Sequence, residues 1–197
     1  YQVYGVDIAK EAIEQSKSKY PKAKLYVIKN NKIPQIKNNT IEAVFMYHVL
    51  HHSREHNQIF QEIYKKLIKN GKFIINDLSS RNPIIALFRC IFLISPKFIK
   101  NRFSDDLVVE GNIPEKYRVN IEDIARLLEE ASFKIEEIGY GHLFFFLFSW
   151  IERFIELSRF QLIRLIYFKL MELETFLLKY SFFKRWAEVY YIRASKI

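Results

Sequence analysis

The stretch Gln2–Asp7, with the sequence QVYGVD, combines a short apolar segment with an acidic residue at its end. This pattern predicts a β-strand that finishes at Asp7. The segment Ile8–Tyr20 follows with Ala12 and Ile13 at helical spacing, and Pro21 would end that helix. A strand followed directly by a helix is the first unit of an α/β fold.

The same alternation continues along the chain. Further strands are predicted at Lys24–Ile28, Ile41–Tyr47, Phe73–Ile75, Lys134–Ile138 and Val189–Arg193. Helices are predicted at Glu55–Lys69, which Asn70-Gly71 would end, after the cap Asn120, and within the aromatic segment 144–183. We therefore expect a doubly wound, Rossmann-like sheet of mostly parallel strands, whose ligands bind beyond the carboxyl ends of the strands.

Composition favours one globular domain over residues 1–197, because half of the residues are hydrophobic and no linker or repeat interrupts the chain. The formal net charge is +9, but the lysines are scattered, which argues against a nucleic-acid-binding surface. Cys90 is the only cysteine, and no signal peptide or membrane-spanning run is recognisable. These features predict a cytoplasmic protein.

The order of the segments resembles the class I S-adenosylmethionine (SAM)-dependent methyltransferases, in their small-molecule branch. The resemblance is carried by Gly5-Val6-Asp7-Ile8, Ile33-Pro34, Ile41–Val44, Val49–His52 and the helix-to-strand segment Lys66–Ile75. It is close from Tyr1 to about Leu78. It is looser beyond, where Trp186–Tyr191 is similar to the family's last, antiparallel strand.

The resemblance implies a set of cofactor-binding residues. Asp7 would hold the ribose hydroxyls of SAM and Ile8 would lie beside the adenine. Asn30 stands where the family usually has an acid, and its amide oxygen could accept from the adenine amine. The backbone of Met46 and Tyr47 would pass the methionine part. The alternative for Asp7 is a purely structural role, capping the helix that begins near Ala9.

The resemblance also implies a missing part. A ribose-binding acid normally lies about 20 residues beyond a glycine-rich turn, whereas six residues precede Asp7. We therefore expect an N-terminally incomplete copy, a fragment without the first strand and the glycine loop. The expected consequence is two sheet fragments with unpaired edges, and a chain that alone binds SAM poorly and is inactive.

Three histidines, His48, His52 and His56, recur at helical spacing and raise the question of a metal site. A bend between Leu50 and Ser53 would break a common helical face, so we predict no metal. His51 or His52 is instead a candidate general base for a hydroxyl acceptor. Methyl transfer by alignment alone, with no catalytic residue, is the other alternative.

The remaining segments would determine the acceptor. Residues 1–78 form the cofactor side, 79–119 a substrate-side insertion, and 144–183 a helical cap before the last strand. The aromatic cap could pack on the sheet, close over an apolar acceptor, or contact a membrane peripherally. The predicted function is methyl transfer from SAM to a small, apolar or lipid-linked acceptor. The competing hypothesis is a non-catalytic domain that docks on a membrane or protein through the cap.

Overall fold

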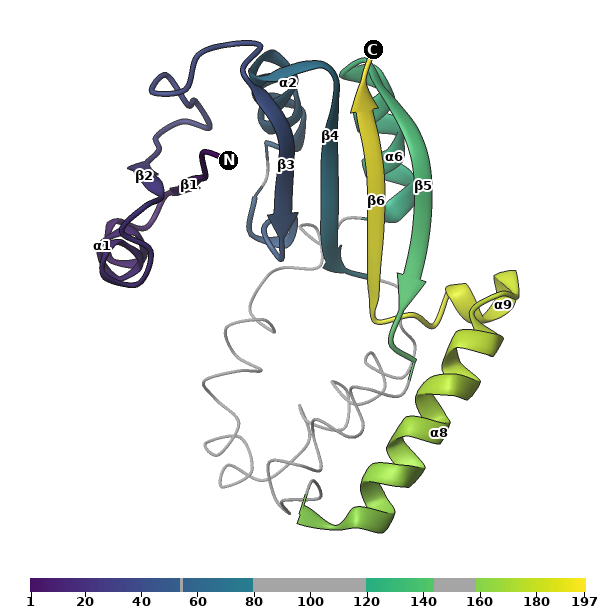
Figure 1. The fold of residues 1–197 in the computed structure, drawn as a ribbon. Coiled ribbons are helices and arrows are strands. Elements are labelled where there is room, and N and C mark those ends of the chain that lie inside the picture. The colour runs from purple at the N-terminus through teal and green to yellow at the C-terminus, as the bar shows by residue number, and fades with distance from the viewer. Residues whose placement is uncertain (54, 80–119, 144–158) are drawn as a thin grey trace, which may run out of the picture.

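The structure is a computed structural model, and it describes residues 1–53, 55–79, 120–143 and 159–197 (Figure 1). The predicted insertion 79–119, apart from Ser79, lies outside the described residues. So does the first part of the predicted helical cap, residues 144–158.

The described strands form two separate sheets. In the first, β1 (Tyr4–Asp7) pairs in parallel with β2 (Lys24–Val27). The second has the order β3-β4-β6-β5 and contains β3 (Ile41–Tyr47), β4 (Leu67–Leu78), β5 (Phe133–Gly141) and β6 (Val189–Lys196). The expected division into two sheet fragments is therefore present among these residues.

Strand directions in the larger sheet follow the predicted pattern. β3 and β4 are parallel, while β6 is antiparallel to both β4 and β5, so β3, β4 and β5 run the same way. The predicted α/β sheet with an antiparallel last strand is confirmed. The carboxyl ends of β3 and β4 consequently meet at one edge, which is the lower edge in Figure 1.

Two helices, α2 (His56–Lys66) and α6 (Ile121–Glu130), cover the same face of the four-stranded sheet (Figure 1). Their inward side chains and those of the sheet form the hydrophobic core, which includes Phe60, Ile63, Phe73, Ile75, Ile124, Leu128, Phe133 and Ile192. Asn120 caps α6 as predicted, because its side chain accepts a hydrogen bond from the amide of Glu122. The core therefore lies between the four-stranded sheet and the helices α2 and α6.

The opposite face of this sheet differs in character. Near β3 it exposes Phe45 and Tyr47, which are 65% and 60% exposed. Near β5 and β6 it carries ion pairs, in which Arg193 contacts both Glu136 and Glu137. A register shift between Ile135 and Glu137 lets both glutamates point to this side. The remaining helix of the first half, α1 (Lys10–Lys19), packs with the small β1–β2 sheet instead.

The boundary between α2 and β4 corrects the sequence prediction. The helix expected to continue to Lys69 ends at Lys66, and β4 begins at Leu67 rather than Phe73. Leu67 is fully buried and pairs with Ile41 of β3. Asn70, within β4, has the left-handed backbone, with φ of 62°, and Gly71 does not. Sheet pairing has overridden helical periodicity here.

The C-terminal helices α8 (Gln161–Leu177) and α9 (Ser181–Lys184) precede β6. α8 extends away from the lower edge of the sheet, below the end of β5 and the start of β6, rather than over a face of the sheet (Figure 1). Its attachment is Glu174, a buried carboxylate that accepts hydrogen bonds from the backbone amides of His142 and Leu143 at 2.8 and 2.7 Å. No described helix is long and apolar enough to cross a membrane.

Candidate functional site

The chain turns sharply where β3 ends. His48 has a positive φ of 53°, and its amide donates to the carbonyl of Asn76 on β4. This turn leads into the short 3-10 helix η1 (Leu50–His52) at the carboxyl edge of the sheet. Because β3 ends at Tyr47, the histidines that follow lie at the edge of the sheet where α/β proteins bind ligands.

Asp77, near the end of β4, organises this edge. Its side chain is buried, and it accepts hydrogen bonds from the amides of Leu50 and Leu78, both at 2.7 Å. Its Oδ1 also lies 2.5 Å from Nδ1 of His51. Burial by itself raises the pKa of Asp77. The hydrogen bond and charge of His51 and the two backbone donors outweigh it, so the net pKa lies below its ordinary value.

The pairing assigns a role to each nitrogen of His51. Since Asp77 is ionised at neutral pH, Nδ1 of the neutral imidazole carries the hydrogen and donates it to Asp77. Nε2 then holds the lone pair, which is the arrangement that a general base requires. Behind the pair, burial and the charge of Asp77 raise the pKa of Tyr190, so this phenol stays protonated.

The other histidines have different surroundings. His52 is exposed, and its ring centre lies 4.0 Å from that of His51. His48 stacks on Tyr47 with ring centres 4.2 Å apart. His56 uses Nε2 in a 2.8 Å hydrogen bond to the carbonyl of Leu50. Among the residues that the structure describes, no group of three His, Cys, Asp or Glu side chains could hold a metal ion.

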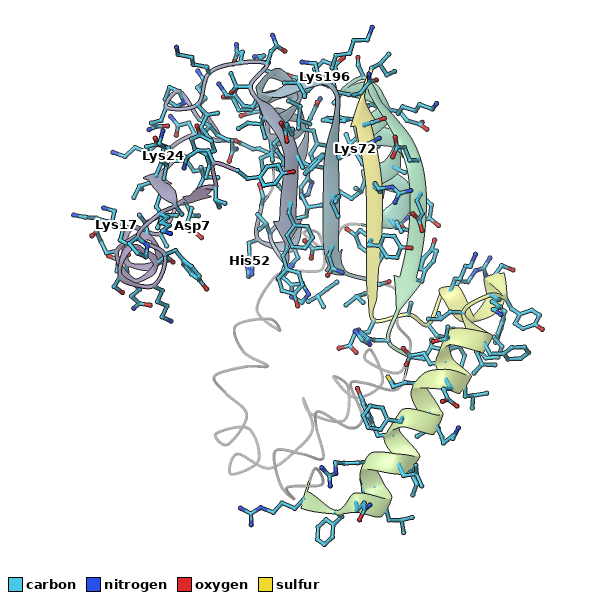
Figure 2. All side chains as sticks on the ribbon, viewed as in Figure 1. Asp7, Lys17, Lys24, His52, Lys72 and Lys196 are labelled. Atoms are coloured by element: carbon cyan, nitrogen blue, oxygen red, sulfur yellow. The ribbon has the colours of Figure 1, made fainter. Side chains whose placement is uncertain are left out.

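Asp7 lies at the carboxyl end of β1 and is exposed, next to α1 (Figure 2). Its Oδ1 accepts a hydrogen bond from the amide of Ala9 at 2.7 Å. This bond stabilises the turn into α1, so the structural role weighed for Asp7 is present in part. Oδ2 of the same carboxylate can still accept a hydrogen bond from a ligand.

The other predicted cofactor residues also follow strand ends. Ile8, directly after β1, is 73% exposed. Asn30 lies in the turn after β2, is exposed and has a positive φ of 52°. Met46 and Tyr47 form the end of β3, where Met46 is half-buried and Tyr47 is exposed. β1 and β2 are neighbours, whereas no described hydrogen-bonded strand joins them to β3.

Asp77 is the functional candidate that the sequence analysis missed. Its signal was available in the strand pairing: β3 and β4 are parallel, and Tyr47 pairs with Asn76. The residue after Asn76 therefore lies beside the turn that begins at His48. Without the register of the two strands, nothing in the local sequence distinguishes Asp77 from an acid that simply ends a strand.

Comparison with known proteins bears on the family and the fold. Residues 1–75 match the family model described as a methyltransferase domain. No curated protein matches the chain.

Three solved structures illustrate the fold. A SAM-dependent methyltransferase from Aquifex aeolicus has a TM-score of 0.54 at 13% identity, over 100% of this chain and 69% of its own. The cyclase SpnF has a TM-score of 0.60 at 13% identity, over 99% and 66%. A geranyl diphosphate methyltransferase, solved with GPP and sinefungin, has a TM-score of 0.58 at 12% identity, over 100% and 64%.

The chain therefore has the fold of the class I SAM-dependent methyltransferases, and its first 75 residues match their methyltransferase domain. The resemblance to this class that was stated from the sequence is confirmed at the level of the fold. Identities of 12–13% establish the fold alone. Since SpnF is named as a cyclase, the reaction has to be argued from the site.

Proposed function

We propose that this chain takes part in SAM-dependent methyl transfer to a small, apolar or lipid-linked acceptor. The observation that carries the proposal is the match of residues 1–75 to a methyltransferase domain, with Asp7 at the end of β1 inside that segment. The geranyl diphosphate methyltransferase supports an apolar acceptor only by analogy of fold.

The residues present fit the ribose end of SAM. Asp7 is exposed at a strand end and uses one oxygen for the amide of Ala9, so its other oxygen can accept from a ribose hydroxyl. Ile8 offers an exposed apolar surface to the adenine, and Asn30 offers an amide oxygen to its amine. The backbone of Met46 and Tyr47 would approach the methionine part.

When bound, SAM supplies a methyl group on a positively charged sulfur, and the acceptor's nucleophile takes that methyl as the carbon–sulfur bond breaks. For a hydroxyl acceptor, Nε2 of His51 would take the proton that the oxygen loses. Asp77 would act as a positioning residue, because its bond to Nδ1 holds the ring and stabilises the imidazolium that forms. His52, exposed beside His51, is the weaker candidate for the base.

The separation of the two sheets supports a second part of the proposal. Among the described residues, no strand connects the β1–β2 sheet with β3. Asp7, the proposed ribose-binding residue, and the histidines after β3 therefore belong to different sheets. We propose that a strand and glycine-rich loop supplied between them is needed for tight binding of SAM, and that this chain alone is inactive. Proximity of the reacting groups depends on such a rigid connection.

The decisive experiment compares SAM binding by this chain with that by a longer chain carrying the residues encoded upstream. Calorimetry should give binding for the longer chain that is at least ~100-fold tighter, since both halves of the site would then be joined. Asp7→Asn in the longer chain should weaken binding about tenfold, the loss of one charge-assisted hydrogen bond. Glu11→Gln on α1 is the matched control. SAM affinity that is equally tight with and without Asp7→Asn would refute the proposed ribose contact.

Activity would be measured in the longer chain, as transfer of labelled methyl from SAM to a panel of apolar phenols and prenyl alcohols. His51→Gln should lower kcat by about 100-fold or more if a base is needed, whereas His52→Gln should stay within a few fold. Equal activity of His51→Gln and the unmodified chain would favour transfer by alignment alone. Asp77→Asn should move the acidic limb of the pH profile to lower pH, because it removes the negative charge that favours a proton on His51. A merely structural role would not produce this shift.

Asp77 also gives a stability test whose sign is fixed. The folded pKa of Asp77 is lowered, so its contribution is fully present above the unfolded pKa of about 4 and is lost as pH falls through the folded pKa. The difference in unfolding free energy between the unmodified chain and Asp77→Asn should therefore be largest at neutral pH. It should shrink as the pH falls below about 4. A difference that is constant with pH would contradict the ionised pair.

The alternative function, a non-catalytic domain that docks through its C-terminal helices, is favoured by the exposed side of α8. The two functions are separable: a docking domain would bind its surface without any affinity for SAM in the longer chain.

A further inference from the structure

The outward side of α8 carries a stripe of large apolar side chains. The outer stripe is defined here as Leu162, Leu165, Ile166, Leu173 and Phe176 of α8, together with Tyr180, which follows the helix. These residues are between 44% and 68% exposed. Their spacing of three, four and seven residues places them along one side of the helix. Lys169 is the charged residue within the same stripe.

The inward side of α8 is also apolar. Ile163, Tyr167 and Leu170 are half-buried, and Glu174 on this side is buried where it holds the amides of His142 and Leu143. The inward side is therefore already used for attachment to the rest of the chain. A helix that is apolar on both sides is normally covered on both, so the outer stripe requires a partner that the described residues do not provide.

Charge identifies the kind of partner. Between residues 159 and 185 the sequence has six Lys or Arg residues and two Glu residues. One of the two acids, Glu174, is buried in the attachment. The exposed charges of this segment are therefore mostly basic, and the exposed acid Glu172 pairs with Lys169 at 2.8 Å. An apolar stripe bordered by Lys and Arg is the pattern of helices that lie in the headgroup region of an anionic bilayer.

A second copy of this chain is a poorer occupant for the stripe. Two copies would each bring a net charge of +9, and facing α8 helices would place the same basic borders against each other. Like charges at such an interface oppose association. An acidic lipid surface instead neutralises these lysines and arginines while the stripe leaves water.

We propose that α8 docks the protein on an anionic membrane surface, with the outer stripe in the headgroup region and Lys169 and Lys179 at lipid phosphates. α8 lies beyond the carboxyl edge of the four-stranded sheet, the edge that also carries His51 and His52 (Figures 1 and 2). Docking would hold that edge near the lipid surface. The docking itself does not depend on methyl transfer.

The test is flotation of the purified chain with vesicles. One set is phosphatidylcholine alone, and the other contains about one third phosphatidylglycerol, enough to give a negative surface potential. We expect at least ~10-fold tighter binding to the anionic set, weakened by added salt. The paired substitution Leu165→Gln with Phe176→Gln should reduce binding at least ~10-fold. Lys169→Gln with Lys179→Gln should remove most of the preference for anionic lipid.

Matched controls carry the same chemistry elsewhere on the surface. Tyr20→Gln and Ile138→Gln replace other exposed apolar residues, and Lys19→Gln with Lys22→Gln removes two charges near α1. All should bind like the unmodified chain, and circular dichroism should confirm that every variant is folded. Unchanged binding by the stripe variant, or no binding to anionic vesicles, would overturn the proposal. So would a dimer in light scattering that the stripe variant converts to a monomer, because the occupant would then be a second copy.

Discussion

Helices α6 and α8 are built on opposite principles. In α6 the apolar residues Ile124 and Leu128 are fully buried against the sheet, while the outward side carries acids and Arg126 in ion pairs. In α8 the outward side is as apolar as the inward side, and the fixed point is one buried carboxylate, Glu174. The fold of this chain accounts for the sequence of α6. It accounts for only half of the sequence of α8.

The largest expected difference concerns core packing. Leu128→Ala should lower the free energy of unfolding by about 2–5 kcal/mol, because Leu128 is fully buried and the cavity would remain. Leu165→Ala on α8, where the side chain is 58% exposed, should change it by less than about 0.5 kcal/mol. Urea denaturation measures both. A large effect of Leu165→Ala would mean that the outer stripe is covered within this chain.

The second difference concerns attachment. Glu174→Ala should cost about 1–3 kcal/mol, because the amides of His142 and Leu143 would lose their acceptors. Glu172→Ala removes an exposed acid two residues away, paired with Lys169, and should cost at most about 0.5 kcal/mol. Hydrogen exchange at the two amides gives a local measurement. Unchanged protection of these amides in Glu174→Ala would contradict the attachment.

A third, smaller difference lies at the helix starts. Asn120→Ala should cost about 1 kcal/mol, since its side chain caps α6. Phe160 occupies the same position before α8 and makes no capping hydrogen bond. Phe160→Ser should therefore raise the free energy of unfolding by up to about 1 kcal/mol. Thermal unfolding resolves both signs. Destabilisation by Phe160→Ser would show that the phenyl ring has a packing role.

The smallest expected effect is the most informative for α8. Leu165→Gln should leave the unfolding free energy within about 0.5 kcal/mol of the unmodified chain, because the side chain contributes little to this fold. Calorimetric unfolding in the absence of lipid checks this value. Comparable stability together with weakened vesicle binding would separate docking from folding at a single residue.

Much of the fold could be predicted from local sequence patterns. The strand predicted at Ile41–Tyr47 has the same bounds as β3, and Asn120 marked the start of α6. The prediction from local patterns was wrong where pairing with a distant segment determines the secondary structure. Leu67 continues the helical spacing of α2, yet it extends into β4 because β3 offers it a strand to pair with. Glu174 is buried and accepts from two backbone amides, a role that its local sequence does not indicate.

The candidate site divides in the same way. The sequence alone identified Asp7 as a carboxylate at a strand end and the histidines as a group at the end of β3, because both signals are local and contiguous. Only the tertiary structure selected His51 over His52. It did so by placing Asp77, 26 residues away along the chain, 2.5 Å from Nδ1 of His51. A parallel register determines such pairs, and register arises from the packing of whole strands rather than from any short stretch.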